Sequence, residues 1–299
     1  MLDVVIIGSG PAGITAAIYA KRANLNVAVV EKEYLGTGQI ADSSRVDNYP
    51  GIPGIDGYSL GEKFREHAES LGVEFTEAQV LSLGQKDGIW IIGCDEDITL
   101  ESKAVIYATG CKNRPLGVPG EEKYYGRGLS FCAVCDGAFY KGKRVAVIGG
   151  GDTALDDAMY LSDICEKVYL VHRREFFRGS ASTLEKLKQK ENVEIIVNAR
   201  VEEITGDKKI DGIILDNKTK LNISGLFAAV GMIPQTELLK EFGVLDGSNY
   251  VKASEDTKTT VNGLFAAGDV RTKQLRQVVT AAADGANAIY SVMEYLRNI

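Results

Sequence analysis

The chain has 299 residues, of which 45% are apolar and 25% are charged, a composition typical of globular proteins that bury one or two cores. Its net charge of −7 argues against nucleic acid or an anionic membrane surface as a partner. No apolar run approaches the ~20 residues of a membrane-spanning helix, and no export signal is evident at the start. We therefore expect a cytoplasmic protein with no membrane contact.

The first stretch, from Asp3 to Glu31, predicts a strand, an amphipathic helix and a second strand. Gly8, Gly10 and Gly13 form a GxGxxG pattern between the first strand and the helix. Such glycines allow a tight turn, close approach of a pyrophosphate and close packing of helix on strand. Amides at the helix start hold phosphate charge, and an acid at the end of the second strand accepts hydrogen bonds from ribose hydroxyls. This pattern predicts a dinucleotide site.

Residues 131–137 read FCAVCDG and place Cys132 and Cys135 two residues apart. In a reducing compartment such a pair is more often catalytic or metal-binding than a structural disulfide. A structural zinc site usually needs four soft ligands, whereas this chain has one close cysteine pair and two distant histidines, His67 and His172. A redox pair is the favoured interpretation, with zinc and a structural disulfide as alternatives. The other cysteines are expected to be buried and inert: Cys94, Cys111 and Cys165.

A second strand, helix and strand pattern follows the cysteine pair, in the stretch that begins KRVAVIGGGDTA. Its glycine pattern is GxGxxA. One constant interval separates each of its key residues from the equivalent residue of the first pattern, the pairs being Gly8 and Gly149, Gly10 and Gly151, Gly13 and Ala154, and Glu31 and His172. Two unrelated glycine turns would not share this register. We interpret the pattern as an internal duplication of a Rossmann unit.

The second unit ends in basic residues where the first ends in Glu31. His172 is followed by Arg173 and Arg174, and Arg178 lies four positions further on. An acid at this point favours a free ribose hydroxyl, whereas a basic cluster accepts a 2′-phosphate through charge-assisted hydrogen bonds. The cluster predicts a preference for NADPH, the alternative being a solvated basic loop.

Further strand-like runs end at Thr109 and Gly110, near Gly231, and at Gly268 and Asp269. After the last of them, residues 275–296 have a helical pattern with small residues in the first turns. An aspartate at a strand end and amides at a helix start suit the hydroxyls and phosphates of a flavin nucleotide, although a simple helix cap is the alternative.

Taken in order, the nucleotide unit with Glu31, the FCAVCDG segment, the unit ending HRREFFR and the terminal AAGD and RQ segments resemble the low-molecular-weight thioredoxin reductases of bacteria. The resemblance covers essentially the whole chain. The CxxCDG segment directly before the second Rossmann unit is its most specific part, because larger flavoprotein disulfide reductases carry their cysteine pair in the FAD domain.

The resemblance implies an α/β fold of two Rossmann-like, three-layer (ββα) nucleotide-binding domains, and a homodimer formed through the FAD domains. Residues 1–112 and 242–299 would form a discontinuous FAD domain, and residues 113–241 an NADPH domain that carries the cysteine pair. The implied FAD residues are Gly8, Gly10, Pro11, Ala12, Gly13, Glu31, Lys32, Gly38, Gln39, Asn48, Thr109, Gly110, Gly268, Asp269, Arg276, Gln277 and Val278. The implied NADPH residues are Gly149, Gly151, Asp152, Thr153, Ala154, His172, Arg173, Arg174 and Arg178.

The resemblance also implies roles in the chemistry. Cys135 would receive electrons from the flavin, Cys132 would attack the disulfide of thioredoxin, and Asp136 would act as the acid. A carboxyl group beside the pair can supply and retrieve the proton that thiol–disulfide exchange requires. Asp136 as a former of the turn before Gly137 is the alternative.

Two positions depart from the pattern of well-known members. Thr37 stands where a glycine is common, and Ala138 precedes Phe139 where two aromatic residues can occur. The second departure affects the expected surface for thioredoxin, so that a thioredoxin-like carrier is an alternative partner. Two other functions stay open: a reductase driven by ferredoxin, against which the basic HRREFFR segment argues, and a nucleotide-binding redox sensor without turnover.

Overall fold

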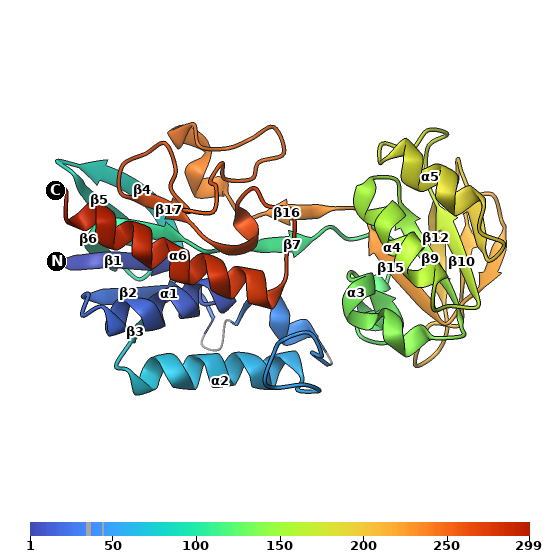
Figure 1. Ribbon diagram of the computed structural model, residues 1–299, viewed down its shortest axis with the longest axis horizontal. Helices are drawn as coiled ribbons and strands as arrows, with labels where there is room; N and C mark the ends of the chain where they lie inside the picture. The colour runs from blue at the N-terminus through green and yellow to red at the C-terminus, as the bar shows by residue number, and fades with distance from the viewer. Residues whose placement is uncertain (34–36, 44) are drawn as a thin grey trace. The chain divides into compact units, whose positions relative to one another are not determined.

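The computed structural model describes residues 1–33, 37–43 and 45–299. The chain forms two units, which are described separately. The first contains Met1–Lys112 and Ile233–Ile299, and the second contains Asn113–Met232. The chain passes between them in β7 (Cys111–Asn113) and β16 (Met232–Pro234), which pair in a two-stranded sheet (Figure 1). The sequence had placed the second boundary between residues 241 and 242.

The first unit is built on a parallel sheet with the order β3-β2-β1-β6, and β17 pairs with the end of β6. From Val4 to Ile7 the first strand is a continuous apolar run, because both faces of the parallel sheet are covered there. Strands β4 and β5 extend β6 as an antiparallel meander. The bounds are β1 Leu2–Ile7, β2 Val27–Glu31, β3 Glu74–Glu77, β4 Val80–Lys86, β5 Ile89–Cys94, β6 Thr99–Tyr107 and β17 Leu264–Ala266.

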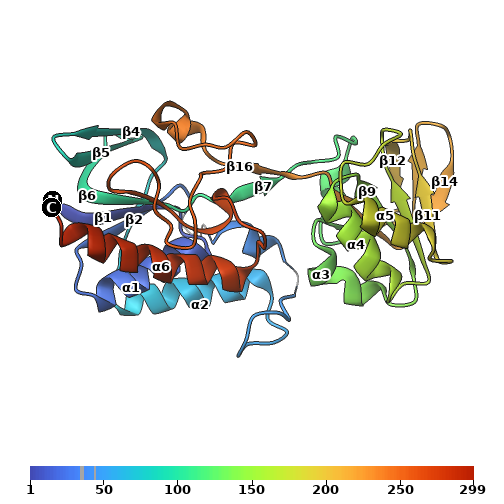
Figure 2. The ribbon, with the colours of Figure 1, turned by 45° about the horizontal axis from the view of Figure 1, so that its top comes forward.

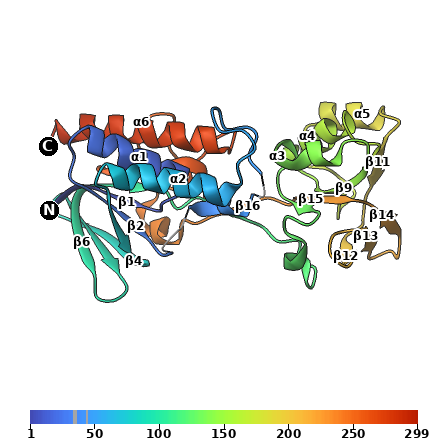
Figure 3. The same cartoon turned by 90° about the horizontal axis from the view of Figure 1, so that it is seen from below.

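Three helices cover one face of this sheet: α1 (Pro11–Arg22), α2 (Gly57–Ser70) and α6 (Val278–Leu296) (Figure 3). Helix α6 lies along α1, as Figure 2 shows. Their close approach depends on Gly285, where a Cβ atom would lie 2.2 Å from the carbonyl oxygen of Ala12. On the other face, Val5 and Ile7 pack with Trp90 of β5. Short 3₁₀ helices complete the unit: η1 Gly38–Asp42, η4 Glu237–Phe242 and η5 Gly268–Val270.

The second unit repeats this plan with a parallel sheet in the order β11-β10-β9-β15-β8. Helices α4 and α5 lie on one face and the antiparallel sheet β12-β13-β14 on the other (Figure 3). The bounds are β8 Leu129–Ser130, β9 Arg144–Gly149, β10 Lys167–Val171, β11 Val193–Ile196, β12 Val201–Thr205, β13 Gly212–Leu215, β14 Lys220–Asn222, β15 Gly225–Ala229, α4 Asp152–Ser162 and α5 Ala181–Lys188.

The two units therefore share one topology, with β9, α4 and β10 in the places of β1, α1 and β2. This arrangement confirms the predicted fold class and the duplicated Rossmann pattern. A short helix, α3 (Ala133–Asp136), and the 3₁₀ helices η2 (Glu121–Tyr124) and η3 (Gly137–Tyr140) complete the second unit. Within the described ranges, no helix has the length and apolar character needed to cross a membrane.

Candidate active site

The glycines at the turn between β1 and α1 are of two kinds: those that the protein's packing requires and one that lies beside free space. Gly8 has a φ of +102°, and a Cβ atom there would lie 2.6 Å from the carbonyl oxygen of Ala108. At Gly13 a Cβ atom would lie 1.9 Å from the carbonyl oxygen of Gly8. Both glycines are therefore required by the protein's own packing. At Gly10 the nearest atom among the described residues would be 3.8 Å from an added Cβ, so their packing leaves room there for a bound group such as a pyrophosphate.

The carboxylate of Glu31 is held at the end of β2 by backbone and side-chain donors. Its Oε2 accepts hydrogen bonds from the N–H of Ser9 (2.9 Å) and from the Ser9 hydroxyl (3.0 Å), and its Oε1 accepts one from the N–H of Lys32 (2.7 Å). Ser9 is fully buried, and the glycine pattern gave no reason to single it out. It fixes the orientation of the acid that is expected to meet a ribose.

Asp269 is a half-buried residue of η5 whose Oδ1 is buried and has no hydrogen-bond partner among the described residues. Burial raises its pKa, and the charges of Lys273 and Arg276 act in the opposite direction. An unpaired buried polar atom is costly unless something outside the chain satisfies it. A hydroxyl group of a flavin nucleotide would supply the missing donor, so the site fits the predicted cofactor.

Other predicted FAD residues lie around the same end of the sheet. The side-chain amides of Asn48 and Gln277 are hydrogen-bonded (2.9 Å), and Gln277 caps α6 together with Thr280. At Gly38, with a φ of +74°, a Cβ atom would lie 3.4 Å from the Cα of Gly10, which places η1 beside the glycine turn. The remaining residues of this predicted set take part in the turn, in α1, in η1 or in the start of α6: Pro11, Ala12, Gln39, Arg276 and Val278.

Thr109 and Gly110, also in the predicted FAD set, are held by a residue that the sequence did not single out. The hydroxyl of Thr109 donates to the carbonyl oxygen of Gln235 (2.8 Å), and the side-chain amide of Gln235 donates to the carbonyl oxygen of Thr109 (2.9 Å). The two residues are 126 positions apart, so sequence spacing carried no sign of this contact.

The turn between β9 and α4 repeats the division seen in the first unit. A Cβ atom at Gly149 would lie 2.4 Å from the carbonyl oxygen of Ala229, and 2.7 Å from the Cβ of Ala154. At Gly151 no atom of the residues that the structure describes lies within 4 Å of an added Cβ. The amino end of α4, with Asp152 and Thr153 in its first turn, thus has the free space that a second pyrophosphate needs.

The side chain of His172 is buried within the second unit. Its ring lies over Gly150, where a Cβ atom would be 2.2 Å from the ring Cε1, and it packs on Phe177 with 4.8 Å between ring centroids. Its Nε2 is 3.2 Å from the carbonyl oxygen of Phe176. Burial lowers its pKa, which favours the neutral ring. His172 therefore supports the loop that follows it, and its contact with a nucleotide stays a prediction.

The predicted basic cluster is solvent-exposed. Arg173, Arg174 and Arg178 are all exposed, and none of their guanidinium groups forms an ion pair within the described part of the chain. The loop is attached to the glycine turn before α4, because the N–H of Arg178 donates to the carbonyl oxygen of Gly150 (2.7 Å). Three cations held beside the amino end of α4 suit a phosphate group.

Cys132 and Cys135 are joined by a disulfide, with 5.3 Å between their Cα atoms. Cys132 is the N-cap of α3, and its sulfur accepts a hydrogen bond from the N–H of Cys135 (3.1 Å). A donor aimed at this sulfur would also stabilise a thiolate. The other cysteines, Cys94, Cys111 and Cys165, are free and buried, as expected.

Asp136 is tied to the cysteine pair through Ser130. The hydroxyl of Ser130 donates to Oδ2 of Asp136 (2.6 Å), and the N–H of Cys132 donates to the Ser130 oxygen (3.1 Å). Burial raises the pKa of Asp136, while the hydrogen bond from Ser130 acts in the opposite direction. A raised pKa makes a protonated carboxyl more available near neutral pH. Ser130 had not been predicted as a site residue.

Apolar side chains are exposed on the helical turns that carry the disulfide. Val134, between the two cysteines, is 58% exposed, and Phe139 of η3 is 43% exposed. Phe131, just before Cys132, packs edge-on against Tyr125, with 5.4 Å between ring centroids. The disulfide therefore lies beside an apolar surface of the kind that protein partners cover.

A sequence profile described as "Pyridine nucleotide-disulphide oxidoreductase" matches residues 2–285. The chain belongs to this family. It is 38% identical to a thioredoxin reductase of Bacillus subtilis, covering 99% of this chain and 95% of that one. It is 39% identical to the "34.2 kDa protein in rubredoxin operon" of Clostridium pasteurianum, covering 99% and 97%. The crystal structure of thioredoxin reductase from Streptococcus pyogenes is 40% identical, with a TM-score of 0.93 and 100% and 99% coverage.

These matches confirm the resemblance to low-molecular-weight thioredoxin reductases that the sequence motifs had indicated. Membership of the family implies FAD and NADPH as the cofactors, as predicted. The bonded cysteine pair fits the redox-active centre of an oxidoreductase of this class.

Proposed function

We propose that this protein is an NADPH-dependent flavoprotein that reduces the disulfide of thioredoxin, or of a thioredoxin-like carrier. The observation that carries the proposal is the Cys132–Cys135 disulfide, with the half-buried carboxyl of Asp136 linked to it through Ser130. Full-length similarity to thioredoxin reductases supports the choice of partner. The basic residues after β10 support NADPH, rather than ferredoxin, as the electron donor.

The first unit would hold FAD. The pyrophosphate would lie at the amino end of α1, where Gly10 leaves room, the ribose would meet Glu31, and the free Oδ1 of Asp269 would accept a hydrogen bond from a flavin-nucleotide hydroxyl. The second unit would hold NADPH at the amino end of α4, with Arg173 and Arg174 on the 2′-phosphate. When bound, the flavin would supply an electron pair from NADPH to the cysteine disulfide.

The protein's own residues would then pass the electron pair on by thiol–disulfide exchange. The thiolate of Cys132 attacks one sulfur of the partner's disulfide, and a mixed disulfide forms as the partner's other sulfur leaves. Cys135 next attacks the Cys132 sulfur, which releases the reduced partner and restores the Cys132–Cys135 bond. The carboxyl of Asp136 supplies the proton that a departing sulfur needs. The exposed apolar surface at Val134 and Phe139 would receive the partner.

We also propose that the first unit forms a homodimer through the outer face of α1 and α6. Tyr19 and Tyr290 are 48% and 75% exposed on this face, and they line one depression together with Arg22, Asn287 and Met293. Exposed aromatic side chains beside apolar ones are typical of a subunit interface. Light scattering would show a dimer, and Tyr290→Asp would give a monomer.

We further propose a cytoplasmic location, with which the three free buried cysteines agree.

Anaerobic stopped-flow absorbance tests the enzyme function directly. NADPH should bleach the flavin of the purified protein within the dead time or shortly after it, and oxidised thioredoxin added next should restore the flavin absorbance. Cys135→Ser should keep the first step and lose the second. A flavin that NADPH does not reduce, but that thioredoxin re-oxidises after chemical reduction, would point to ferredoxin as donor. A protein that binds no flavin would favour a redox sensor instead.

A further inference from the structure

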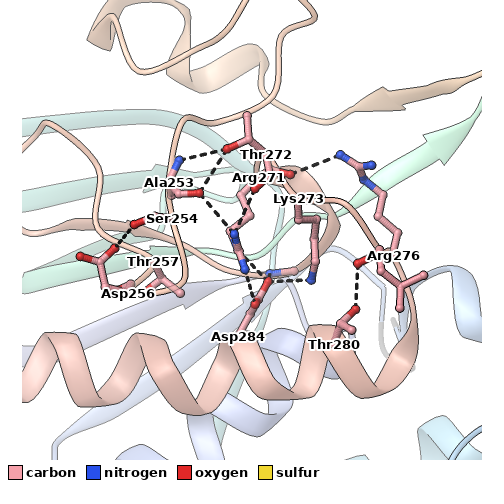
Figure 4. Close-up of polar contacts among 12 residues, drawn as sticks. Ala253, Ser254, Asp256, Thr257, Arg271, Thr272, Lys273, Arg276, Thr280 and Asp284 are labelled. Carbon is pink, nitrogen blue, oxygen red and sulfur yellow. Dashed lines mark hydrogen bonds and ion pairs between the residues drawn. The ribbon is translucent and has the colours of Figure 1, made fainter. Parts of the chain in front are cut away.

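Asp284 of α6 collects four hydrogen bonds in the buried space next to the turn that carries Asp269. Its Oδ2 accepts from the N–H of Gly268 (2.9 Å), from Nε of Arg271 (2.8 Å) and from Nζ of Lys273 (2.9 Å), and its Oδ1 accepts from Nη2 of Arg271 (2.6 Å). Figure 4 shows Arg271 and Lys273 converging on Asp284. Every one of these side chains is at least nine-tenths buried.

The guanidinium group of Arg271 extends this arrangement to a third segment of the chain. Its Nη1 donates to the carbonyl oxygens of Ala253 (3.3 Å) and Thr272 (3.0 Å), as seen in Figure 4. The guanidinium group thereby connects α6, the turn after β17 and the segment that contains Ala253. Arginine suits this task because its donors form a rigid fork.

The backbone of Asp269 is held from the opposite side as well. Its carbonyl oxygen accepts hydrogen bonds from the thiol of Cys111 (2.9 Å) and from Nε of Arg276 (3.3 Å). Arg276 also donates to the carbonyl oxygen of Arg271 (3.4 Å) and lies over the ring of Tyr250. The turn is thus fixed at both ends, while the Oδ1 of Asp269 remains unpaired within the described residues.

The same junction fixes the distance from Asp269 to α1. At Gly268, which has a φ of +81°, a Cβ atom would lie 2.9 Å from the Cβ of Ala12. At Gly285, which follows Asp284, a Cβ atom would lie 2.2 Å from the carbonyl oxygen of Ala12. Ala12 belongs to the first turn of α1. Asp284 thus connects Gly268, to which it is hydrogen-bonded, with Gly285, which follows it in the chain. The contacts of both glycines with Ala12 hold the Asp269 turn against the amino end of α1.

The cluster also carries charges that act on the neighbouring carboxylate of Asp269, which an apolar contact would not do. Two buried cations, Arg271 and Lys273, share the single carboxylate of Asp284, whose pKa is lowered by their hydrogen bonds despite the opposing effect of burial. Burial raises the pKa of Asp269, and the charge of Asp284 adds to this effect, whereas the charges of Lys273, Arg276 and Arg271 lower it. Arg271 and Lys273 thus oppose the loss of charge at Asp269, and an ionised carboxylate is the better acceptor for a ligand hydroxyl.

We propose that Asp284, together with Arg271, is a positioning residue for FAD: it fixes the turn so that Asp269 presents its free carboxylate oxygen at a set distance from the amino end of α1. The inference rests on the proposed function, because it assumes that these two elements hold one FAD molecule. Asp284 itself does not touch the flavin nucleotide in this scheme; it acts through Gly268 and Asp269.

The test is a double-mutant cycle on FAD affinity, measured by quenching of FAD fluorescence on titration with FAD-free protein. Asp284→Asn keeps the side-chain volume but loses the charge and one acceptor. We expect its dissociation constant for FAD to rise at least tenfold. In an Asp269→Asn background, the same change should raise it less than threefold further, since the carboxylate that Asp284 positions is already gone.

Asp256→Asn is the matched control, because Asp256 lies in the same region (Figure 4) and its Oδ1 accepts hydrogen bonds from the Ser254 hydroxyl and the N–H of Lys258, with none from the Asp269 turn among the described residues. It should bind FAD like the wild type. If Asp284→Asn does not fold, Arg271→Lys replaces it in the cycle, because it keeps the charge but loses the fork, and it should show the same coupling with Asp269→Asn.

Three outcomes would overturn the inference. The first is that Asp284→Asn or Arg271→Lys binds FAD as tightly as the wild type. The second is that the increases in the dissociation constant of the single variants multiply fully in the double variant with Asp269→Asn. The third is an equal loss of FAD affinity in Asp256→Asn. A wild-type protein that binds no FAD would instead count against the proposed function, so the two failures are distinguishable.

Discussion

The hydroxyl of Ser130 lies 2.6 Å from Oδ2 of Asp136, and its oxygen also accepts the N–H of Cys132. One small side chain at the end of β8 thus connects the proton-carrying group to the first cysteine of the pair. The carboxyl is held in place before a partner arrives, which matters because proton transfer requires a donor within hydrogen-bond reach of the sulfur.

Ser130→Ala tests this connection. Removing the hydroxyl should raise the pKa of Asp136 further and leave its carboxyl free to rotate, so we expect kcat for thioredoxin reduction to fall by about tenfold. Reduction of the flavin by NADPH should be unchanged, since it does not use the pair. Ser162→Ala, which removes a hydroxyl of α4 that donates to the backbone carbonyl of Met159, is the control. Normal turnover in Ser130→Ala would contradict the role.

Asp136→Asn tests the proton itself. We expect the rate of disulfide exchange to fall by about 10²- to 10⁴-fold, the usual range for loss of a general acid. Because burial raises the pKa of Asp136, the protonated form of the wild type should be lost as pH rises through that raised pKa, and the exchange rate should fall with it. The variant should lack this limb of the pH profile. A limb that persists in Asp136→Asn would belong to another group.

Replacing Arg173 and Arg174 with Ala tests the coenzyme preference. Each charge-assisted hydrogen bond to a phosphate is worth roughly 1.5–3 kcal/mol before solvent screening, so we expect kcat/KM for NADPH to fall by about 10²-fold. NADH lacks the 2′-phosphate, and its kcat/KM should change less than about threefold. Lys208 and Lys209, also exposed in the second unit, provide a matched double-Ala control. Equal losses for both coenzymes would refute the 2′-phosphate contact.

The elements that the sequence predicted well are those defined by local patterns. The apolar runs of β1, β9, β15 and β17 are recognisable because both faces of a parallel sheet are buried. The glycine turns are recognisable because Gly8 and Gly149 have no space for a side chain. These features depend on neighbours in the sequence or on a backbone that only glycine can adopt.

The contacts that the sequence did not reveal are polar and distant. Glu31 was predicted to face a ribose, but its hydrogen bond with Ser9 spans 22 residues, and the contact of Arg271 with Asp284 crosses from a turn to a helix. Serine and aspartate occur in most turns and helix caps, so residue type alone does not mark such pairs. Their geometry arises only when the strands and helices are packed.

Thr37, which departs from the family pattern, has a structural explanation that leads to a prediction. A Cβ atom at Gly61 of α2 would lie 2.4–2.6 Å from the side chain of Thr37, so the threonine occupies the space that Gly61 leaves. Gly61→Ala should therefore destabilise the protein by about 1–3 kcal/mol, even though alanine is the better helix former. Thr37→Gly should restore the melting temperature in that background. Gly84→Ala, at an open position, should have little effect.

Asp157 of α4 yields a prediction on stability and pH. Burial raises its pKa to about 7, and the charge of Asp156 adds to this effect. A carboxyl whose pKa is higher in the folded state than in the unfolded state stabilises the fold fully below the unfolded value, near 3.8, and loses that contribution as pH rises through about 7. Asp157→Asn, which cannot ionise, should therefore melt at a higher temperature than the wild type at pH 8.

The difference in the free energy of unfolding between Asp157→Asn and wild type should be largest above pH 7. It reaches at most about 4 kcal/mol there, because one pKa unit corresponds to about 1.4 kcal/mol. It should shrink toward zero near pH 4. Melting temperatures of Asp157→Asn and wild type, measured together across this range, test the prediction, and the exposed neighbour change Asp156→Asn should give a much smaller shift. A difference between Asp157→Asn and wild type that does not vary with pH would mean that Asp157 does not titrate near neutrality.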